Sequence, residues 1–195
     1  MGHPAQDLKY PFQWTFRIVA SRHNPDVVYA GSQHVHKSTN GGQSYTKPKA
    51  IASTFDSYDI GVPAMDNRRV LIYVAAGTFK TATKDLVYAV WADLSGAPGC
   101  RSASSEPGSS VASACKTRIW FTRSTDGGAT WSAKKMIHNP AGRNDQLNPW
   151  LAVDEPTGRL AVMYYSTVGG PRTQTNVWYQ SSCDQGATWS APFKV

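Results

Sequence analysis

One eight-residue pattern occurs three times in the chain and limits the folds that the chain can adopt. It reads Ser-x-Asp/Asn-x-Gly-x-Ser/Thr-aromatic, and each copy stands between two runs of strand-forming residues. The Asp or Asn side chain can accept hydrogen bonds from turn amides, and the Gly two residues later can supply the positive φ of a tight hairpin. The pattern predicts a self-bonded corner with a structural acidic residue and an aromatic side chain that packs between neighbouring units. Its defining residues are Ser38, Asn40, Gly42 and Tyr45, then Ser124, Asp126, Gly128 and Trp131, and finally Ser182, Asp184, Gly186 and Trp189.

The segments around these corners are short β-branched and aromatic runs, such as 69–74, 86–91 and 160–165, separated by turn residues. Helical periodicity is almost absent. Many short strands with turns between them predict an all-β protein, which is a sandwich, a barrel or a propeller. The internal repetition favours the propeller, because each blade repeats the same supersecondary unit.

The repeated corner resembles the Asp-box, or bacterial neuraminidase repeat, of sialidases and their relatives. Two copies match at every defining position, whereas the first has Asn40 and Tyr45 in place of Asp and Trp. Residues 86–195 look most similar to bacterial sialidase-like proteins, and residues 8–48 look more like the repeats of sortilin-type and xyloglucanase-type propellers. The resemblance implies a β-propeller built from four-stranded antiparallel blades.

The spacing of the boxes predicts about four blades, because repeats of this kind take roughly 40–50 residues each. We expect one propeller domain, or part of one, over residues 1–195. The sialidase resemblance implies six blades in a closed ring, so a homo-oligomer or a longer parent chain is expected to complete it. A small closed ring is the alternative. The expected parts are a first Asp-box blade at 8–48, a blade without a clear box at 49–93, a loop insertion at 94–117 and two Asp-box blades at 118–195.

Two of the three cysteines, Cys100 and Cys115, bracket a polar stretch of small residues that cannot pack by itself. A disulfide between them would stabilise the fold by about 3 kcal/mol through loop closure. Such a bond indicates a secreted or cell-surface protein. The alternative is two unrelated free thiols, and Cys183 has no partner in either case.

The net charge of +7 raises the question of nucleic-acid binding, but the 20 basic residues are spread along the chain without a basic stripe. We therefore expect a carbohydrate or protein ligand and no nucleic acid. No apolar run is long enough for a membrane helix, so no membrane contact is expected. Neither a glycine-rich phosphate loop nor a metal-ligand spacing of histidines is present, so we expect no cofactor and no metal.

The sialidase resemblance implies an arginine triad for the substrate carboxylate, a tyrosine nucleophile activated by a glutamate, and an aspartate acid/base. Arg17 matches the first triad arginine, although Val19 stands where that motif has proline. The chain has two glutamates, Glu106 and Glu155, and neither lies where it would polarise a tyrosine of an inner strand. The full sialidase set is therefore not expected in this chain.

Two short acidic clusters next to arginines are the best candidates for a polar site. They place Arg68 and Arg69 beside Asp59 and Asp66, and an Arg fork suits a carboxylate ligand. The interpretation is that Arg17, Arg68 and Arg69 bind ligand, with Asp59, Asp66 and Tyr165 as candidate catalytic residues. The favoured function is a non-catalytic glycan- or protein-binding module. The alternative is an exo-sialidase-like glycoside hydrolase whose site is completed by another chain or segment.

Overall fold

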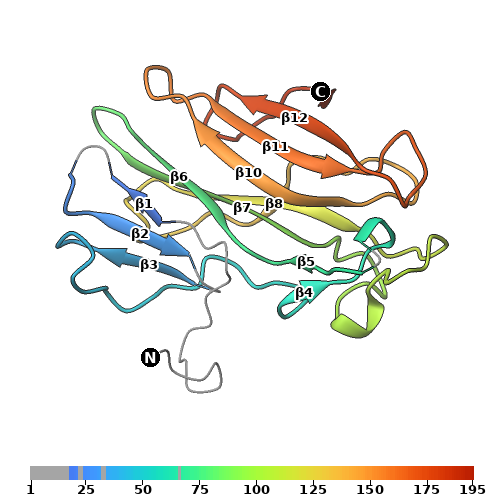
Figure 1. The fold of residues 1–195 in the computed structure, drawn as a ribbon. Coiled ribbons are helices and arrows are strands. Elements are labelled where there is room, and N and C mark those ends of the chain that lie inside the picture. The colour runs from blue at the N-terminus through green and yellow to red at the C-terminus, as the bar shows by residue number, and fades with distance from the viewer. Residues whose placement is uncertain (1–17, 22–23, 32–33, 66) are drawn as a thin grey trace.

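The computed structural model describes residues 18–21, 24–31, 34–65 and 67–195. It is all-β, with thirteen strands in four antiparallel sheets (Figure 1). Two short 3₁₀ turns, η2 (Pro63–Met65) and η3 (Ala103–Ser105), lie in the connections. In the described residues, no helix is long and apolar enough to cross a membrane.

Three of the sheets are meanders that we call blades 1, 2 and 3, in chain order. Blade 1 contains β1 (Ile18–Ala20), β2 (Val28–Gly31) and β3 (Val35–Ser38). Blade 2 contains β6 (Ala75–Lys80), β7 (Asp85–Leu94), β8 (Thr117–Ser124) and β9 (Lys135–Met136). Blade 3 contains β10 (Gln146–Val153), β11 (Leu160–Ser166), β12 (Asn176–Ser182) and β13 (Phe193–Lys194). A two-stranded sheet of β4 (Asp59–Ile60) and β5 (Val70–Leu71) lies in the connection between blades 1 and 2.

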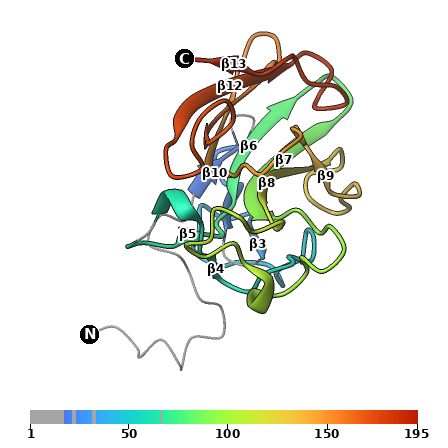
Figure 2. The ribbon, with the colours of Figure 1, turned by 90° about the vertical axis from the view of Figure 1, so that its right-hand side faces the viewer.

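The first strand of each blade lies toward the middle of the molecule, and the blades follow one another around it (Figures 1 and 2). The core lies between blades 2 and 3, because β7 and β8 are buried on both faces whereas β11 alternates. Leu160, Val162 and Tyr164 face this core. Met163 and Tyr165 point the other way and remain 47% and 44% exposed. Blade 3 therefore has one covered and one open face.

The sheets divide the chain differently from the ranges expected from the sequence. There are four sheets, but the one in the connection before blade 2 has only two strands. β7 pairs with β8 from Val87↔Ser124 to Leu94↔Thr117, so the loop at 94–117 joins neighbouring strands of one blade. The distance between the first two boxes is taken up by this long loop and by the connection that carries β4 and β5. Sequence spacing cannot separate a long loop from an additional blade.

All three Asp-box corners have the same hydrogen bonds. The Gly N–H donates to the Ser Oγ in each copy, at 2.9 Å for Gly42–Ser38 and at 2.8 Å for Gly128–Ser124 and for Gly186–Ser182. The acidic or amide oxygen accepts from the Ser/Thr N–H four residues later, at 2.8–2.9 Å. The aromatic residues differ, because Trp189 packs edge-on against Phe121 of blade 2 whereas Tyr45 is 43% exposed. Blade 1 has no preceding blade among the described residues for Tyr45 to pack against.

Basic side chains hold the second and third corners to the preceding blade. Lys37 donates to the carbonyl of Gly127 at 3.0 Å, and Lys49 donates to the carbonyl of Ala129. At the next junction Arg123 donates to the carbonyl of Gln185 at 2.8 Å, and Lys135 to that of Ala187 at 2.6 Å. Blade junctions thus use cations against the partly negative carbonyls that a tight turn leaves unpaired.

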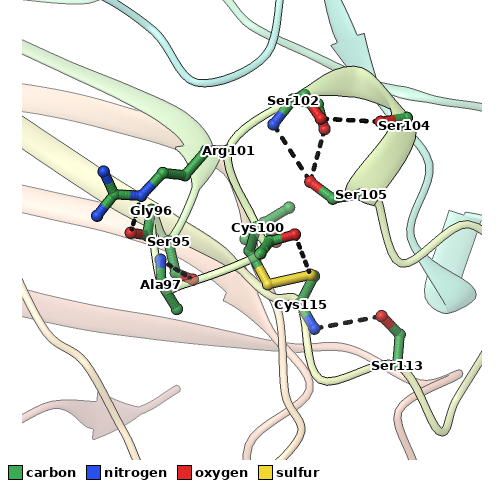
Figure 3. The surroundings of a disulfide bond; sticks show 12 residues. Ser95, Gly96, Ala97, Cys100, Arg101, Ser102, Ser104, Ser105, Ser113 and Cys115 are labelled. Carbon is green, nitrogen blue, oxygen red and sulfur yellow. Dashed lines mark hydrogen bonds between the residues drawn. A yellow bond between two sulfur atoms is a disulfide. The ribbon is translucent and has the colours of Figure 1, made fainter.

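The loop 95–116 is closed by a disulfide between Cys100 and Cys115 (Figure 3). Arg172, on the β11–β12 connection, donates to the carbonyls of Ser113 and Cys115, both at 2.6 Å. Its Nε also donates to Asp145 at 2.7 Å in an ion pair that is almost fully buried. Blade 3 therefore fixes the far end of this blade 2 loop. Cys183, in the third box, is an exposed free thiol.

Candidate functional site

A hollow of about 510 Å³ lies between the connection before blade 2 and the open face of blade 3. This volume is in the usual range of about 300–1,000 Å³ for small-molecule sites. Three candidates from the sequence, Arg68, Arg69 and Tyr165, line it together. Asp59 joins them through Arg69, whereas Arg17 and Asp66 lie outside the described residues. The lining residues are Met65, Arg68, Arg69, Leu71, Tyr73, Asn148, Trp150, Met163, Tyr164, Tyr165 and Val177.

Aromatic side chains from two sides of the hollow form its apolar part. Tyr73, just before β6, is oriented by its hydroxyl, which donates to the carbonyl of Pro149 at 3.2 Å. Trp150 and Tyr165 come from β10 and β11 and are 50% and 44% exposed. Several aromatic rings that are partly exposed and close together form an apolar surface patch, and such patches often mark ligand-binding sites.

Trp150 reaches the hollow from the open face of β10. It pairs with Met163 of the same face, and it alternates along the strand with the core residues Leu147 and Leu151. The strand also contains a bulge, because the register between β10 and β11 shifts between Leu147 and Trp150 and Asn148 has a positive φ of 48°. Bulges often occur next to functional sites. The alternation of 147–152 was therefore a sequence signal that could have placed Trp150 on the open face.

Arg69 is held by two carboxylates at the rim of the hollow. Its Nε donates to Asp59 Oδ1 at 2.5 Å, and its Nη2 donates to both oxygens of Glu106 at 2.5 Å. Glu106 Oε2 also accepts from the Gly61 N–H at 2.6 Å. These hydrogen bonds raise the pKa of Arg69 further above its already high value, so it stays charged.

Glu106, like Trp150, is a site residue that sequence reasoning missed. Its place in the loop 95–116, far from the acidic clusters in sequence, indicated a peripheral position. The loop folds back because the disulfide closes it and because the Gly108 N–H donates to the Gly61 carbonyl at 2.9 Å. The predicted disulfide was a usable signal, since the Cys100–Cys115 bond limits how far Glu106 can lie from the end of β7.

Two aspartates, Asp56 and Asp93, are buried next to each other, and Asp56 lies near Arg69 and its two carboxylates. Asp93 accepts backbone hydrogen bonds from Phe55, Asp56 and Leu94, and Asp56 accepts one from the Ser57 N–H. Burial raises the pKa of Asp56 and of Asp93. The Oδ2 atom of Asp56 is buried and has no hydrogen-bond partner. Asp56 is thus a carboxyl group whose surroundings favour the protonated form.

The two neighbouring tyrosines of β11 have different roles. Tyr164 is buried, and its hydroxyl donates to Gln180 Oε1 at 2.7 Å, with its pKa raised mainly by burial. Tyr165 faces the hollow. Among the described residues, no carboxylate accepts a hydrogen bond from the Tyr165 hydroxyl, since Glu106 and Asp59 pair with Arg69.

Metal chemistry gains no support from the described part of the chain, which contains no group of three or more His, Cys, Asp or Glu side chains placed to hold an ion. His36 is buried in blade 1, and burial lowers its pKa. It packs edge-on against Tyr45 of the first box, with ring centroids 6.3 Å apart. His36 lies in blade 1 and does not line the hollow.

Comparison with known proteins gives one family match and several structural neighbours. Residues 106–195 match the BNR repeat-like domain. A protein of unknown function from Dyadobacter fermentans has a TM-score of 0.57 at 13% identity, covering 96% of this chain and 52% of that one. The α-L-arabinofuranosidase Arb93A from Fusarium graminearum has a TM-score of 0.52 at 13% identity, covering 95% and 51%. The search of curated proteins returns no match.

A Hadza microbial sialidase, Hz136, also matches, with a TM-score of 0.44 at 21% identity over 88% of this chain and 35% of that chain. The chain therefore spans about half the length, or less, of the solved structures that it matches. The neighbours with TM-scores above 0.5 support the blade architecture.

Proposed function

We propose, from the premise that this chain belongs to the sialidase-like BNR/Asp-box superfamily, that it is a glycan-binding module. The observation that carries the proposal is the hollow that joins Tyr73, Trp150 and Tyr165 to the arginine pair at 68 and 69. Sugar rings stack on aromatic faces through their apolar C–H surfaces, and their hydroxyls need nearby donors and acceptors. The hollow offers both. The disulfide supports a secreted or cell-surface setting for such a module.

The test is a titration calorimetry panel on the purified chain. It contains lactose, cellobiose, arabinobiose, digalacturonic acid and 3′-sialyllactose; arabinobiose is included because it is the ligand in a solved complex of the Fusarium enzyme. We expect at least one sugar to bind, and Trp150→Ala to weaken it about tenfold or more, which corresponds to about 1.4 kcal/mol of lost stacking.

The matched control is Phe193→Ala, which removes an exposed ring of the same sheet outside the hollow. This variant should bind as tightly as the unmodified chain. Equal weakening by both substitutions, or no binding of any panel member, would contradict the proposal.

A second candidate function, glycoside hydrolysis, is favoured by the carboxyl groups at the rim. Asp59 and Glu106 both contact Arg69, and Asp56 is a buried carboxyl with a raised pKa, as a general acid requires. The same panel separates the two functions if product release is followed by chromatography. Binding without product supports the module, and turnover that is lost in Asp56→Asn supports the hydrolase.

A further inference from the structure

The charge of the hollow is set by an ion-paired cluster, not by free arginines. Nε and Nη2 of Arg69 are both taken up by Asp59 and Glu106, the latter through both of its oxygens. Two carboxylates on one guanidinium give this cluster a net charge of −1. Arg68 supplies the other cation among the described lining residues. A carboxylated ligand therefore meets a site whose described charges nearly cancel, because Arg69 is already paired with Asp59 and Glu106.

Glu106 is held in place from several directions. The Gly61 N–H donates to its Oε2, and the disulfide and Arg172 fix the loop that carries it. The side chain of Glu106 is only 12% exposed, so moving it away from Arg69 would leave a poorly solvated carboxylate unpaired. Arg69 is 47% exposed, so its remaining donors face solvent and are available to neutral hydroxyls.

We propose that Glu106, together with Asp59, is the specificity-determining residue of the hollow, and that it makes the site select neutral glycans over carboxylated ones by occupying Arg69. This inference rests on the proposed glycan-binding function. A neutral hydroxyl is not repelled by Asp59 and Glu106, so the negative charge of the cluster costs a neutral sugar little binding free energy. A ligand carboxylate must instead compete with these two carboxylates for the same guanidinium. Without Glu106, the guanidinium fork of Arg69 would be open to bidentate pairing with a carboxylate.

The experiment measures Kd for the best-binding neutral disaccharide among lactose, cellobiose and arabinobiose, and for digalacturonic acid and 3′-sialyllactose. In the unmodified chain we expect the neutral sugar to bind at least about tenfold tighter than either acid, a difference of about 1.4 kcal/mol. In Glu106→Gln, which keeps the shape and removes the charge, we expect this ratio to fall by about tenfold because the acidic sugars bind more tightly.

Asp59→Asn is the second variant, since it removes one of the two negative charges on Arg69 without touching the disulfide loop, and it should shift the ratio in the same direction. Ser109→Ala is the matched control, because Ser109 is exposed in the same loop, and it should leave the ratio unchanged. Binding with a ratio that neither carboxylate variant changes would overturn this inference alone. An unmodified chain that prefers the acidic sugars would also overturn it, whereas no binding of any sugar would remove the proposed function as well.

Discussion

The two blade junctions and the open face of blade 3 carry different residues at equivalent positions. The residue before the box Ser is Lys37 in blade 1 and Arg123 in blade 2, and each donates to the carbonyl just after the next box Asp. The residue nine places after the box Asp or Asn is Lys49 in blade 1 and Lys135 in blade 2. Lys49 donates to the carbonyl of Ala129 and Lys135 to that of Ala187, in each case two residues after the first carbonyl. In blade 3 the same positions hold Ser181 and Phe193.

This difference separates two kinds of surface. The junctions place a pair of cations against a turn of unpaired carbonyls, which fixes the angle between neighbouring blades. Blade 3 instead presents an apolar row of paired residues across its sheet, from Trp150 and Met163 to Tyr179 and Phe193. It lacks the groups that would hold a following Asp-box corner in the same way. Only the part of this face around Trp150, Met163 and Tyr165 forms a wall of the hollow, and Phe193 lies outside it.

Among substitutions that would destabilise the junction between blades 2 and 3, the largest loss of stability is expected at Gly186. Its φ is +81°, and a Cβ atom there would lie 2.3 Å from the Phe121 ring of blade 2. Gly186→Ala should therefore lower the free energy of unfolding by about 3 kcal/mol, combining backbone strain with overpacking. Chemical denaturation followed by tryptophan fluorescence measures it.

Gly41→Ala is the comparison for this substitution. Gly41 also has a positive φ of +67°, but a Cβ atom there would meet nothing within 4 Å. It should cost only about 1 kcal/mol, from strain alone. Equal losses at both glycines would show that contact between blades contributes nothing.

A smaller effect is expected from the cations. Lys135→Met keeps the aliphatic stem and removes the donor to the Ala187 carbonyl, and should cost about 0.5–1 kcal/mol. Phe193→Ala, at the equivalent position of blade 3, should change stability by less than about 0.5 kcal/mol, because Phe193 is 65% exposed. Thermal unfolding of both variants checks the contrast, and the opposite order would contradict the distinction between junction and open face.

The smallest effect is a local response of the corners to acid. Hydrogen bonds from the side chain and backbone of Thr130 lower the pKa of Asp126, and those of Thr188 do the same for Asp184. A lowered folded-state pKa gives stability that is present above the unfolded value of about 3.9 and lost as pH falls through the folded value. Asn40 does not titrate, so the first corner lacks this response.

Amide NMR shifts of Thr130, Thr188 and Ser44, followed from about pH 5 down to about pH 1, measure this difference. The chemical shifts of the Thr130 and Thr188 amides should change as Asp126 and Asp184 are protonated, and the shift of the Ser44 amide should not. Asp126→Asn should abolish the response of the second corner only. A Ser44 amide that titrates with the others would assign the effect to global unfolding.

The corners and the strands were predictable from sequence because their physics is local. Ser124, Asp126 and Gly128 satisfy one another within one turn, so the eight-residue pattern contains nearly all of the information. The grouping of strands into blades was less predictable. β7 and β8 pair across a loop of more than twenty residues, and nothing in the composition of that loop shows that the chain returns to the same sheet.

The site was predictable only in part, for the same reason. Arg68 and Arg69 were found because charged residues are adjacent in sequence there. Glu106 was missed because its contact with Arg69 spans 37 positions and depends on the closed loop. Alternation with Leu147 and Leu151 predicts that Trp150 lies on the outer face of its strand, but it does not show that this face lies beside Arg68 and Arg69. Both contacts depend on tertiary geometry that short-range patterns do not encode.

The most direct test of the account is hydrogen exchange by mass spectrometry with and without the best-binding sugar of the panel. The account predicts slower exchange of peptides covering 65–73, 148–150 and 163–165, and no change in the box corners. Protection confined to blade 1 or to the corners, with the peptides of the hollow unaffected, would contradict the claim that this hollow is the ligand site.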